Sequence, residues 1–592
     1  MFLREVAIFD NKPGRLKSFL RKFLKVILWI LGSIITILLL LLLLIQIPAV
    51  QNFLKDEAVA FIKGKIETPV KIDNLEIGFP KKIILSGFYF EDQAGDTLVA
   101  GERLAVNIDF YKLLSNSVQI SSIELEGAVA NISRGRDSVF NFDYIIEAFA
   151  TDTPQDTTAA MEISIGTVGL KRVSFRWDDA LSESKIAARV QNLEAQIGVF
   201  DPDKMIYEIE DLTVEGLRVR MDQGIVVKTP RDPNGIPPEE SPLPDLRLGD
   251  ISVKTAKIFY NNEELKLSSG FDIEELIAKV NELQLTDEYA DLDFLEVTGL
   301  KGTILVNKDE PSEAVLQDTT SQSSPDWKVK LGRADLKDLA VRFRDENSPV
   351  ISNGMNFMDM DLTNLNLEAK DLYYRLDSIS GNVNSFTLRD KSGLDIQSFR
   401  TEFLYSEKSA YLKNLYLQTP NTILQDRIGA EYSSLETLEN DLGEVYIDAN
   451  LENSKLAFAD VLLLAPQLRN TNPFQSNPNA IVNIHGKVTG KINDLSISNF
   501  EADGIGATSV AMSGNIKGLP NVENAYYNLN IRQFQTTSRD LNQFLPPGTI
   551  PDSITLPERF NLNGNFSGTA ENFRTKNEPE QQFWQCCCKC KR

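Results

Sequence analysis

The stretch Leu248-Gly-Asp-Ile-Ser-Val-Lys-Thr-Ala-Lys-Ile-Phe-Tyr-Asn-Asn262 decides the fold, because the chain repeats it. Two other segments, residues 165–179 and residues 331–345, superpose on it without a gap. All three share a glycine near the start, and these glycines are 83 residues apart each time: Gly166, Gly249 and Gly332. Self-similarity at a fixed period indicates an array of structural repeats.

Apolar side chains in this stretch are separated by steps of two and three residues. They are Leu248, Ile251, Val253, Ala256, Ile258 and Tyr260. A step of two is typical of a strand, whereas a step of three turns the next side chain to the other face. A β-bulge or a kink absorbs such a step, so the repeat predicts strands that bend at a bulge or kink.

The repeat also allows an inference about the direction and the number of the strands. It contains no helix long enough for a crossover between parallel strands, so the predicted sheet is antiparallel and stacked end to end. At about 11–12 residues per strand and turn, we expect on the order of 45 strands and a length on the order of 200 Å. Polar runs, expected as exposed connections, precede the three copies at 151–160, 229–244 and 307–325. Short helices are expected at 141–149, 456–468 and 538–544.

The N-terminal region differs from the repeats. Residues Val26 to Ile47 carry no charge, and basic residues precede them. This predicts a single membrane-spanning helix with a cytoplasmic N-terminus. The alternative, a cleaved signal peptide, usually has a shorter apolar core. Residues 48–66 predict an amphipathic helix, ended by Gly64, whose apolar residues are Phe53, Leu54, Ala58, Phe61 and Ile62.

Composition excludes several functions. The net charge of −23 argues against a nucleic-acid partner. Cysteine is absent before Cys586, so no disulfide is expected in the fold, and we interpret the tail with Cys586, Cys587, Cys588 and Cys590 as a truncated or frame-shifted end.

Motifs for catalysis, cofactors or metals are missing. The lone His485 is interpreted as a strand residue, and no nucleophile or phosphate-binding motif occurs, so we predict neither an enzyme nor a cofactor or metal site. Glycine-rich runs at 486–491 and 504–509 predict hairpin turns. The acidic pairs Asp178-Asp179 and Asp359-Met-Asp361 are interpreted as turns or solvated faces rather than calcium ligands.

The N-terminal order of segments resembles a known family. A basic stub, one anchor and a short helix are followed by Thr68-Pro-Val-Lys-Ile-Asp-Asn-Leu-Glu-Ile77 and by Ile84-Leu-Ser-Gly-Phe-Tyr-Phe-Glu-Asp92. Runs such as Ile120-Ser-Ser-Ile-Glu-Leu-Glu-Gly-Ala-Val129 come next. The chain thus resembles the AsmA-like proteins and, within them, the N-terminal part of the TamB-type translocation and assembly module subunits of Bacteroidetes-like bacteria.

The resemblance implies a mostly β fold, in which a transmembrane helix precedes an elongated β-sheet folded as a U-shaped groove. It implies a bacterial inner-membrane protein, largely periplasmic, that moves phospholipid toward the outer membrane and maintains the envelope. The alternative is an assembly factor for outer-membrane β-barrels. TamB proteins meet a barrel partner through a C-terminal domain that this sequence does not show. The expected segments are a cytoplasmic stub (1–25), the anchor (26–47), an amphipathic helix (48–66), an AsmA-like β segment (67–150), β-repeats (151–400), a further β-groove segment (401–570) and the cysteine-rich tail (571–592).

If a groove exists, apolar columns of the repeat form its wall. The candidates for contact with acyl chains are Val173, Phe175, Trp177, Ala256, Ile258, Tyr260, Leu339, Val341 and Phe343. The same residues fit a packed core, and alternation alone does not separate an open groove from a filled interior.

Overall fold

The computed structural model describes most of the chain. The described residues are 14–78, 82–109, 117–150, 162–202, 204–226, 245–284, 287–307, 326–349, 351, 353–522, 524–544, 557–569 and 572–576. They divide into two compact units, Met1–Arg176 and Trp177–Arg592, and the boundary falls inside strand β6. Unit 2 consists mostly of strands, whereas unit 1 contains helices and strands in similar proportion.

Unit 1 begins with two helices and continues as a small sheet. Its elements are α1 (Gly14–Ile45), α2 (Pro48–Ile66), β1 (Val70–Gly78), β2 (Lys82–Glu91), β3 (Thr97–Ile108), β4 (Ser117–Glu126), β5 (Val129–Arg134), α3 (Asp143–Phe149) and β6 (Glu162–Asp179). Strands β1 to β4 pair antiparallel in chain order, and β4 pairs parallel with β6. A small core of Ile66, Val70, Leu98 and Tyr144 joins α2 and α3 to this sheet.

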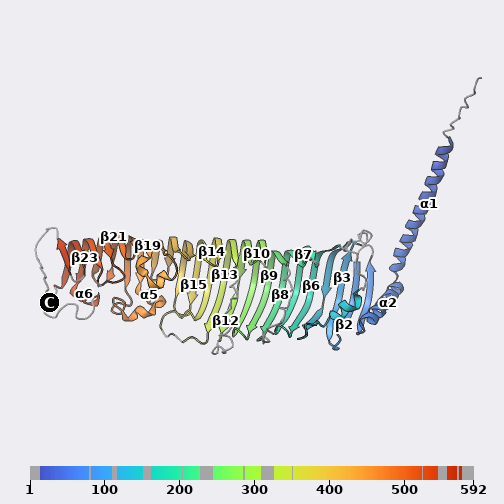
Figure 1. Cartoon of the computed structure of the whole chain (residues 1–592), viewed down its shortest axis with the longest axis horizontal. Coiled ribbons are helices and arrows are strands. Elements are labelled where there is room, and N and C mark those ends of the chain that lie inside the picture. Colours follow the sequence, from blue (N-terminus) through green and yellow to red (C-terminus); the bar gives the residue numbers. More distant parts are fainter. Residues whose placement is uncertain are drawn as a thin grey trace, which may run out of the picture. The chain divides into compact units, whose positions relative to one another are not determined.

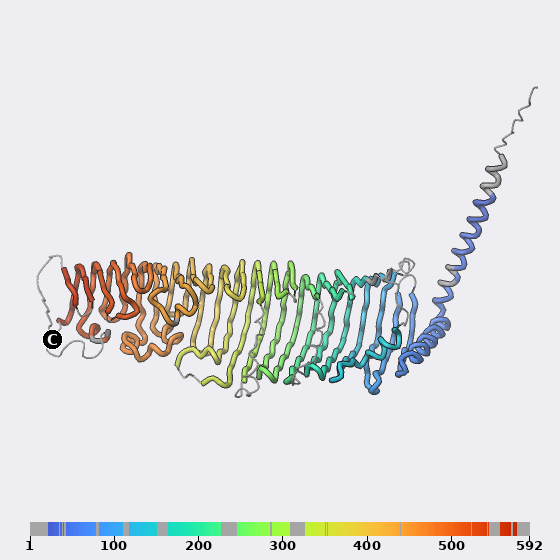
Figure 2. Tube along the Cα trace, viewed as in Figure 1, coloured from blue at the N-terminus to red at the C-terminus, as the bar shows by residue number. Residues whose placement is uncertain are grey.

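Unit 2 is a long series of strands that lie side by side in chain order (Figures 1 and 2). The first strands are β7 (Ser184–Asp201), β8 (Ile206–Gln223), β9 (Asp245–Asn262), β10 (Leu267–Gln284), β11 (Tyr289–Thr298), β12 (Lys301–Val306), β13 (Lys328–Asp345), β14 (Asp359–Arg375), β15 (Ser378–Asp390), β16 (Asp395–Ser406), β17 (Ser409–Gln418) and β18 (Ile423–Glu431). The remaining strands are β19 (Tyr446–Ala457), β20 (Ile481–Lys491), β21 (Asp494–Ile505), β22 (Thr508–Lys517), β23 (Tyr526–Thr537), β24 (Arg559–Gly568) and β25 (Phe573–Lys576).

Short helices occur where the sequence predicts them. Residues 141–149 contain α3, residues 456–468 contain α5 (Phe458–Leu464) and the start of the 3-10 helix η4 (Pro466–Asn470), and residues 538–544 form α6 (Ser538–Phe544). A single turn, α4 (Thr437–Asn440), and the 3-10 helix η3 (Leu442–Glu444) lie between β18 and β19. Asp460 and Asp540 occupy the same position in α5 and α6, and each accepts hydrogen bonds from an earlier hairpin turn, at Thr419 and at Ala507.

The predicted antiparallel sheet is wrong in part, because the sheets are mixed. β8 pairs parallel with β9, and both β11 and β12 pair parallel with β13. Each repeat contributes three strand positions, which is an odd number. If antiparallel pairing continued without a break, the first strand of the next repeat would run opposite to the first strand of this one. The chain instead returns between repeats, and the sequence offers its polar runs for that return. Residues 151–160 and 229–244, and residues 308–325 of the third run, lie outside the described residues.

The predicted strand number is also wrong. The strands of the repeats are about twice as long as assumed, and β7, β8, β9, β10 and β13 each contain 18 residues. From β7 to β18 the pairing occupies eleven positions, which is about 50 Å at roughly 4.8 Å per strand. The sheet is therefore wider along its strands, and shorter across them, than predicted.

The predicted bulges are present at the same place in every copy. Arg172, Thr255 and Asp338 have φ angles of 52°, 56° and 54°, in the left-handed region. Between β9 and β10 the pairing passes over Thr255 and Glu274. One residue in each strand is thus left out of the pairing, and the register is the same on both sides of it. The apolar side chains before and after this kink, called the bulge below, fall on the same face.

Helix α2 occupies the predicted 48–66, but the predicted end at Gly64 is wrong. Gly64 lies inside the helix, which ends at Glu67 in the left-handed conformation, where the Glu67 N–H donates to the Lys63 carbonyl. The face toward the sheet contains Val59, Ile62 and Ile66, whereas Phe53, Leu54 and Phe61 are exposed.

Helix α1 (Gly14–Ile45) contains most of the predicted span Val26–Ile47 and ends two residues before the end of that span. Among the residues whose side chains are described, no helix combines the length and the apolar character needed to cross a membrane. The anchor therefore stays a prediction. Of the expected tail, residues 573–576 form β25, and residues 577–592 with the four cysteines lie outside the described residues.

Candidate functional site

Six of the nine predicted wall residues lie on two strands of unit 2. Ala256, Ile258 and Tyr260 alternate along β9, and Leu339, Val341 and Phe343 alternate along β13. Alternation places each set on one face of its strand. Ala256 and Leu339, next to the bulges, are buried at 0% and 7% exposure, and the other four are half-buried.

The pairing of β10 and β12 brings the two sets together. Ile258 lies opposite Phe271, Phe271 opposite Gly302, and Gly302 opposite Val341. In the next row, Tyr260, Ser269, Ile304 and Phe343 follow one another in the same way. Directly opposite residues share a face, so these form two lines of side chains across the sheet.

Both lines continue over the neighbouring strands. From β7 to β14, the Ile258 row is Ala188, Val219, Ile258, Phe271, Gly302, Val341 and Leu362. The complete Tyr260 row is Ile186, Met221, Tyr260, Ser269, Ile304, Phe343 and Met360. Between β7 and β14, Ser269 is the one polar side chain of these two rows, and on β15 Asp390 lies opposite Leu362.

A third row is longer and lies on the other side of the bulges. Each of eleven successive strand positions, from β7 to β18, contributes one apolar side chain. The Val253 row is Leu193, Val214, Val253, Leu276, Val297, Leu336, Leu367, Phe386, Phe399, Leu417 and Leu424. Together the three rows define the apolar face of unit 2.

Sequence reasoning missed most of these residues. The ungapped copies of the repeat do not include β7, β8, β10 or β12, so these strands contributed no candidates. A signal was present, because Ala188 and Phe271, and likewise Val219 and Gly302, are 83 residues apart. The residue types differ between the copies, but a small side chain faces a larger one in both pairs.

Three predicted wall residues are placed separately. Val173, Phe175 and Trp177 lie on β6, of which residues up to Arg176 belong to unit 1. Val173 is buried, and Phe175 and Trp177 are half-buried. They occupy the position in their copy that Ala256, Ile258 and Tyr260 occupy in theirs, and the three rows are described from β7 onward.

The opposite face of the same strands is charged. Lys257 pairs with Asp272, and Lys254 lies 3.5 Å from Glu275 across β9 and β10. On β13, the Lys337 ammonium donates to Glu296, and this hydrogen bond raises the pKa of Lys337. The sheet therefore has one solvated face and one apolar face.

Side chains of the apolar face stay partly accessible. Ile258, Tyr260, Phe271 and Phe343 are half-buried rather than buried, and Met221 is 38% exposed. A filled sandwich core would bury these residues.

The described residues show no cluster of metal-binding side chains. They contain no group of three or more acidic, histidine or cysteine side chains that could hold a metal ion. His485 lies in β20 opposite Glu501, as predicted for a strand residue. Asp179 accepts hydrogen bonds from the Leu181 N–H and from Ser182, as expected for a turn.

The two glycine-rich runs have different outcomes. Residues 504–509 form the turn between β21 and β22, as predicted. Residues 486–491 lie within β20, so the predicted hairpin turn there is wrong. Strand pairing continues through Gly486 and Gly490, which lie opposite Phe500 and Leu495.

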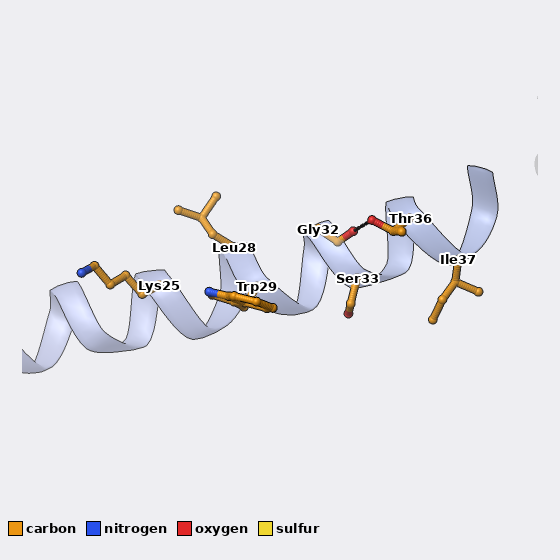
Figure 3. A pocket seen from close by; sticks show the side chains of 7 residues that line it. All are labelled: Lys25, Leu28, Trp29, Gly32, Ser33, Thr36 and Ile37. Carbon is orange, nitrogen blue, oxygen red and sulfur yellow. Dashed lines mark hydrogen bonds between the residues drawn. The ribbon is translucent and has the colours of Figure 1, made fainter. Parts of the chain in front are cut away.

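A hollow on α1 is not a ligand site either. It is lined by seven residues of that one helix, and Figure 3 shows them along successive turns. One hydrogen bond joins two of them, from the Thr36 hydroxyl to the Gly32 carbonyl. No second element closes the hollow among the described residues, so it is the furrow between neighbouring side chains.

Comparison with known proteins agrees with the repeat architecture. Residues 20–395 match the model of the AsmA family, and this is more than half of the chain. Searches of curated proteins and of solved structures returned no match. The family match does not separate TamB-type subunits from other members, so that narrower resemblance stays a prediction. The matched region contains most of the N-terminal helices and the repeated strands that follow them. Because it covers more than half of the chain, the chain belongs to the AsmA family.

Proposed function

We propose that this protein holds lipid acyl chains on the apolar face of unit 2 and carries phospholipid between the inner and outer membranes of a bacterial envelope. The observation that carries the proposal is the unbroken Val253 row, flanked by the Ile258 and Tyr260 rows. Transfer of a methylene group from water to an apolar surface gains about 0.8 kcal/mol. A continuous apolar face therefore binds tails without specific polar contacts.

The bulges supply the shape that the proposal needs. β9 and β13 each contain a residue in the left-handed conformation, Thr255 and Asp338, at the same place in the repeat. Aligned bends fold a sheet along a line, and the apolar rows lie on both sides of that line. We infer a U-shaped groove with the three rows inside and the charged face outside.

Helix α1 is proposed as the anchor. Six successive apolar side chains, from Val26 to Leu31, are all exposed, including Trp29 at 81%. Six residues pass more than once around a helix, so every side of this segment is apolar. A helix that is apolar all round needs an apolar surrounding, and the basic residues before it favour a cytoplasmic N-terminus.

The alternative, assembly of outer-membrane barrels, requires an open sheet edge that accepts a strand. At β1 that edge is occupied by α2. The Gln51 side chain donates to the Ile77 carbonyl at 3.2 Å, and Lys55 donates to the Asp73 carbonyl at 3.3 Å. Pairing with a client strand at β1 would break both bonds.

Photo-crosslinking in cells tests lipid transport. A photoreactive residue at position 258 or 341 should form phospholipid adducts, because both side chains belong to the Ile258 row. The matched controls are positions 257 and 342, the next residues on the opposite face. Adducts with protein alone at 258 and 341, or equal lipid labelling at 257 and 342, would contradict the proposal.

A further inference from the structure

Helix α2 has two apolar faces, and the sheet uses only one. Ile62 and Ile66 pack toward the core that contains Val70 and Leu98. On the other side, Phe53 is 65% exposed and Phe61 is 59% exposed. Residues four and eight positions apart share a side of a helix, so these two rings lie along one line.

Helix α3 extends this exposed surface. The Phe149 ring lies 6.4 Å from the Phe61 ring, measured between centroids, so the two helices meet at these aromatics. Phe149 is 46% exposed and Ile146 is 61% exposed. The α2–α3 patch is defined by Phe53, Leu54, Phe61, Ile146 and Phe149.

The fold of unit 1 does not depend on the patch. α2 is held by Ile66 in the core and by the hydrogen bonds of Gln51 and Lys55 to β1. α3 is held by Tyr144, whose hydroxyl donates to the Glu91 carbonyl at 2.7 Å. Large exposed apolar side chains gathered on two helices indicate a binding surface.

We propose that the α2–α3 patch lies in the headgroup region of the same bilayer that holds α1. Only Gln46 and Ile47 separate α1 from α2, so the patch begins within a few residues of the proposed end of the anchor. Glu57 lies between Phe53 and Phe61 on this face and is exposed. A carboxylate among aromatics suits the interface rather than the acyl interior. The inference rests on the proposed function through the anchor.

Fluorescence quenching in vesicles tests the patch. The full chain, with its four cysteines replaced by serine, carries one cysteine labelled with an NBD fluorophore and is reconstituted in phosphatidylcholine vesicles that contain 5-doxyl or 12-doxyl lipid. Three positions are compared: Phe61→Cys in the patch, Lys63→Cys on another side of α2, and Leu40→Cys in α1.

We expect the label at 61 to be quenched at least twofold more than the label at 63, and more by 5-doxyl than by 12-doxyl lipid. Equal quenching at 61 and 63, with strong quenching at 40, would overturn the patch and leave the anchor standing. Weak quenching at 40 as well would overturn the anchor on which both rest. Shielding at 61 that rises with protein density, without lipid quenching, would mean that a second copy covers the patch and would also overturn the inference.

Discussion

Phe271 of β10 lies opposite Gly302 of β12, and a Cβ atom on Gly302 would come within 3.0 Å of the Phe271 ring. The equivalent pair one repeat earlier is Ala188 opposite Val219. Each pair thus fills the same part of the Ile258 row with one small and one larger side chain. The summed side-chain volume of the two pairs is similar, but the larger residue is on the second strand in one copy (Val219) and on the first strand in the other (Phe271).

This relationship predicts that the pair can be exchanged only together. Gly302→Val alone should destabilise unit 2 by about 1–3 kcal/mol through overpacking. Phe271→Ala alone should cost about 1–3 kcal/mol because it opens a void. The double variant, which copies the Ala188–Val219 pair, should recover at least about 1 kcal/mol of their sum in urea unfolding. If the stability changes of the two single variants simply added in the double variant, the two side chains would not fill a common space.

Thr255 has a left-handed backbone conformation that disfavours a β-branched residue. Thr255→Gly should therefore stabilise the sheet by about 0.5–1 kcal/mol, after allowing for the greater freedom of glycine in the unfolded chain. Asp338→Gly should gain less, since aspartate tolerates this conformation. The control is Ser252→Gly within the same strand, which should destabilise by about 0.5–1 kcal/mol. Denaturant midpoints measure all three, and a loss of stability in Thr255→Gly would refute the strain.

Asp460 holds helix α5 against the β17–β18 turn. Its carboxylate accepts from the Thr419 hydroxyl at 2.6 Å and from the Thr422 hydroxyl at 2.5 Å. Asp460→Ala should weaken the protection of α5 by about 2 kcal/mol or more, as measured by native-state hydrogen exchange. Asp540→Ala is the matched control, because it should affect α6 and leave α5 unchanged. Simultaneous loosening of both helices would argue against two local attachments.

The Asp390 turn predicts a pH dependence. Burial raises the pKa of Asp390, but hydrogen bonds from Ser392 and from the Asp361 N–H outweigh it, and the net pKa is lowered. The stabilisation is fully present above the unfolded pKa of about 3.9 and is lost as the pH falls through the lower folded value. Asp390→Asn should reduce stability at pH 7 by about 1 kcal/mol and flatten this acid limb. An unchanged acid limb would contradict the assignment.

Ile258 and Phe259 provide a matched pair for function. They are neighbours on β9, but Ile258 belongs to the apolar face and Phe259, 50% exposed, points to the other side. Ile258→Asp should reduce lipid binding about tenfold or more, because a carboxylate among acyl chains is costly. Phe259→Asp should bind as the unaltered protein does. Circular dichroism must show that both variants fold, and equal binding by two folded variants would remove the apolar face from the function.

Periodicity predicted the strands, the bulges and the helix at 48–66, because each reflects which side chains face away from water. It did not predict the direction of β9 relative to β8, since alternation is the same in parallel and antiparallel strands. The polar run at 229–244 was the available clue, because a chain that returns needs a long connection. Nor did the helical pattern of α2 reveal which apolar side meets the sheet, as both Phe61 and Ile62 fit a helix face.

Most of the Ile258 row was missed for a different reason. A match of residue types between copies favours positions where each copy keeps an apolar side chain, such as Phe175, Ile258 and Val341. At Phe271 and Gly302 the summed volume of the two side chains is similar to that of Ala188 and Val219. A comparison of one position at a time does not detect this. The strand register was needed to join the two residues.

The odd number of strand positions in each repeat has a consequence for the length of the protein. A unit of 83 residues that enters and leaves in the same direction can be duplicated or deleted without reversing the strands after it. Each duplication would add three strand spacings, about 14 Å. Gene duplication can therefore lengthen or shorten this sheet in steps of one repeat while every later strand keeps its direction.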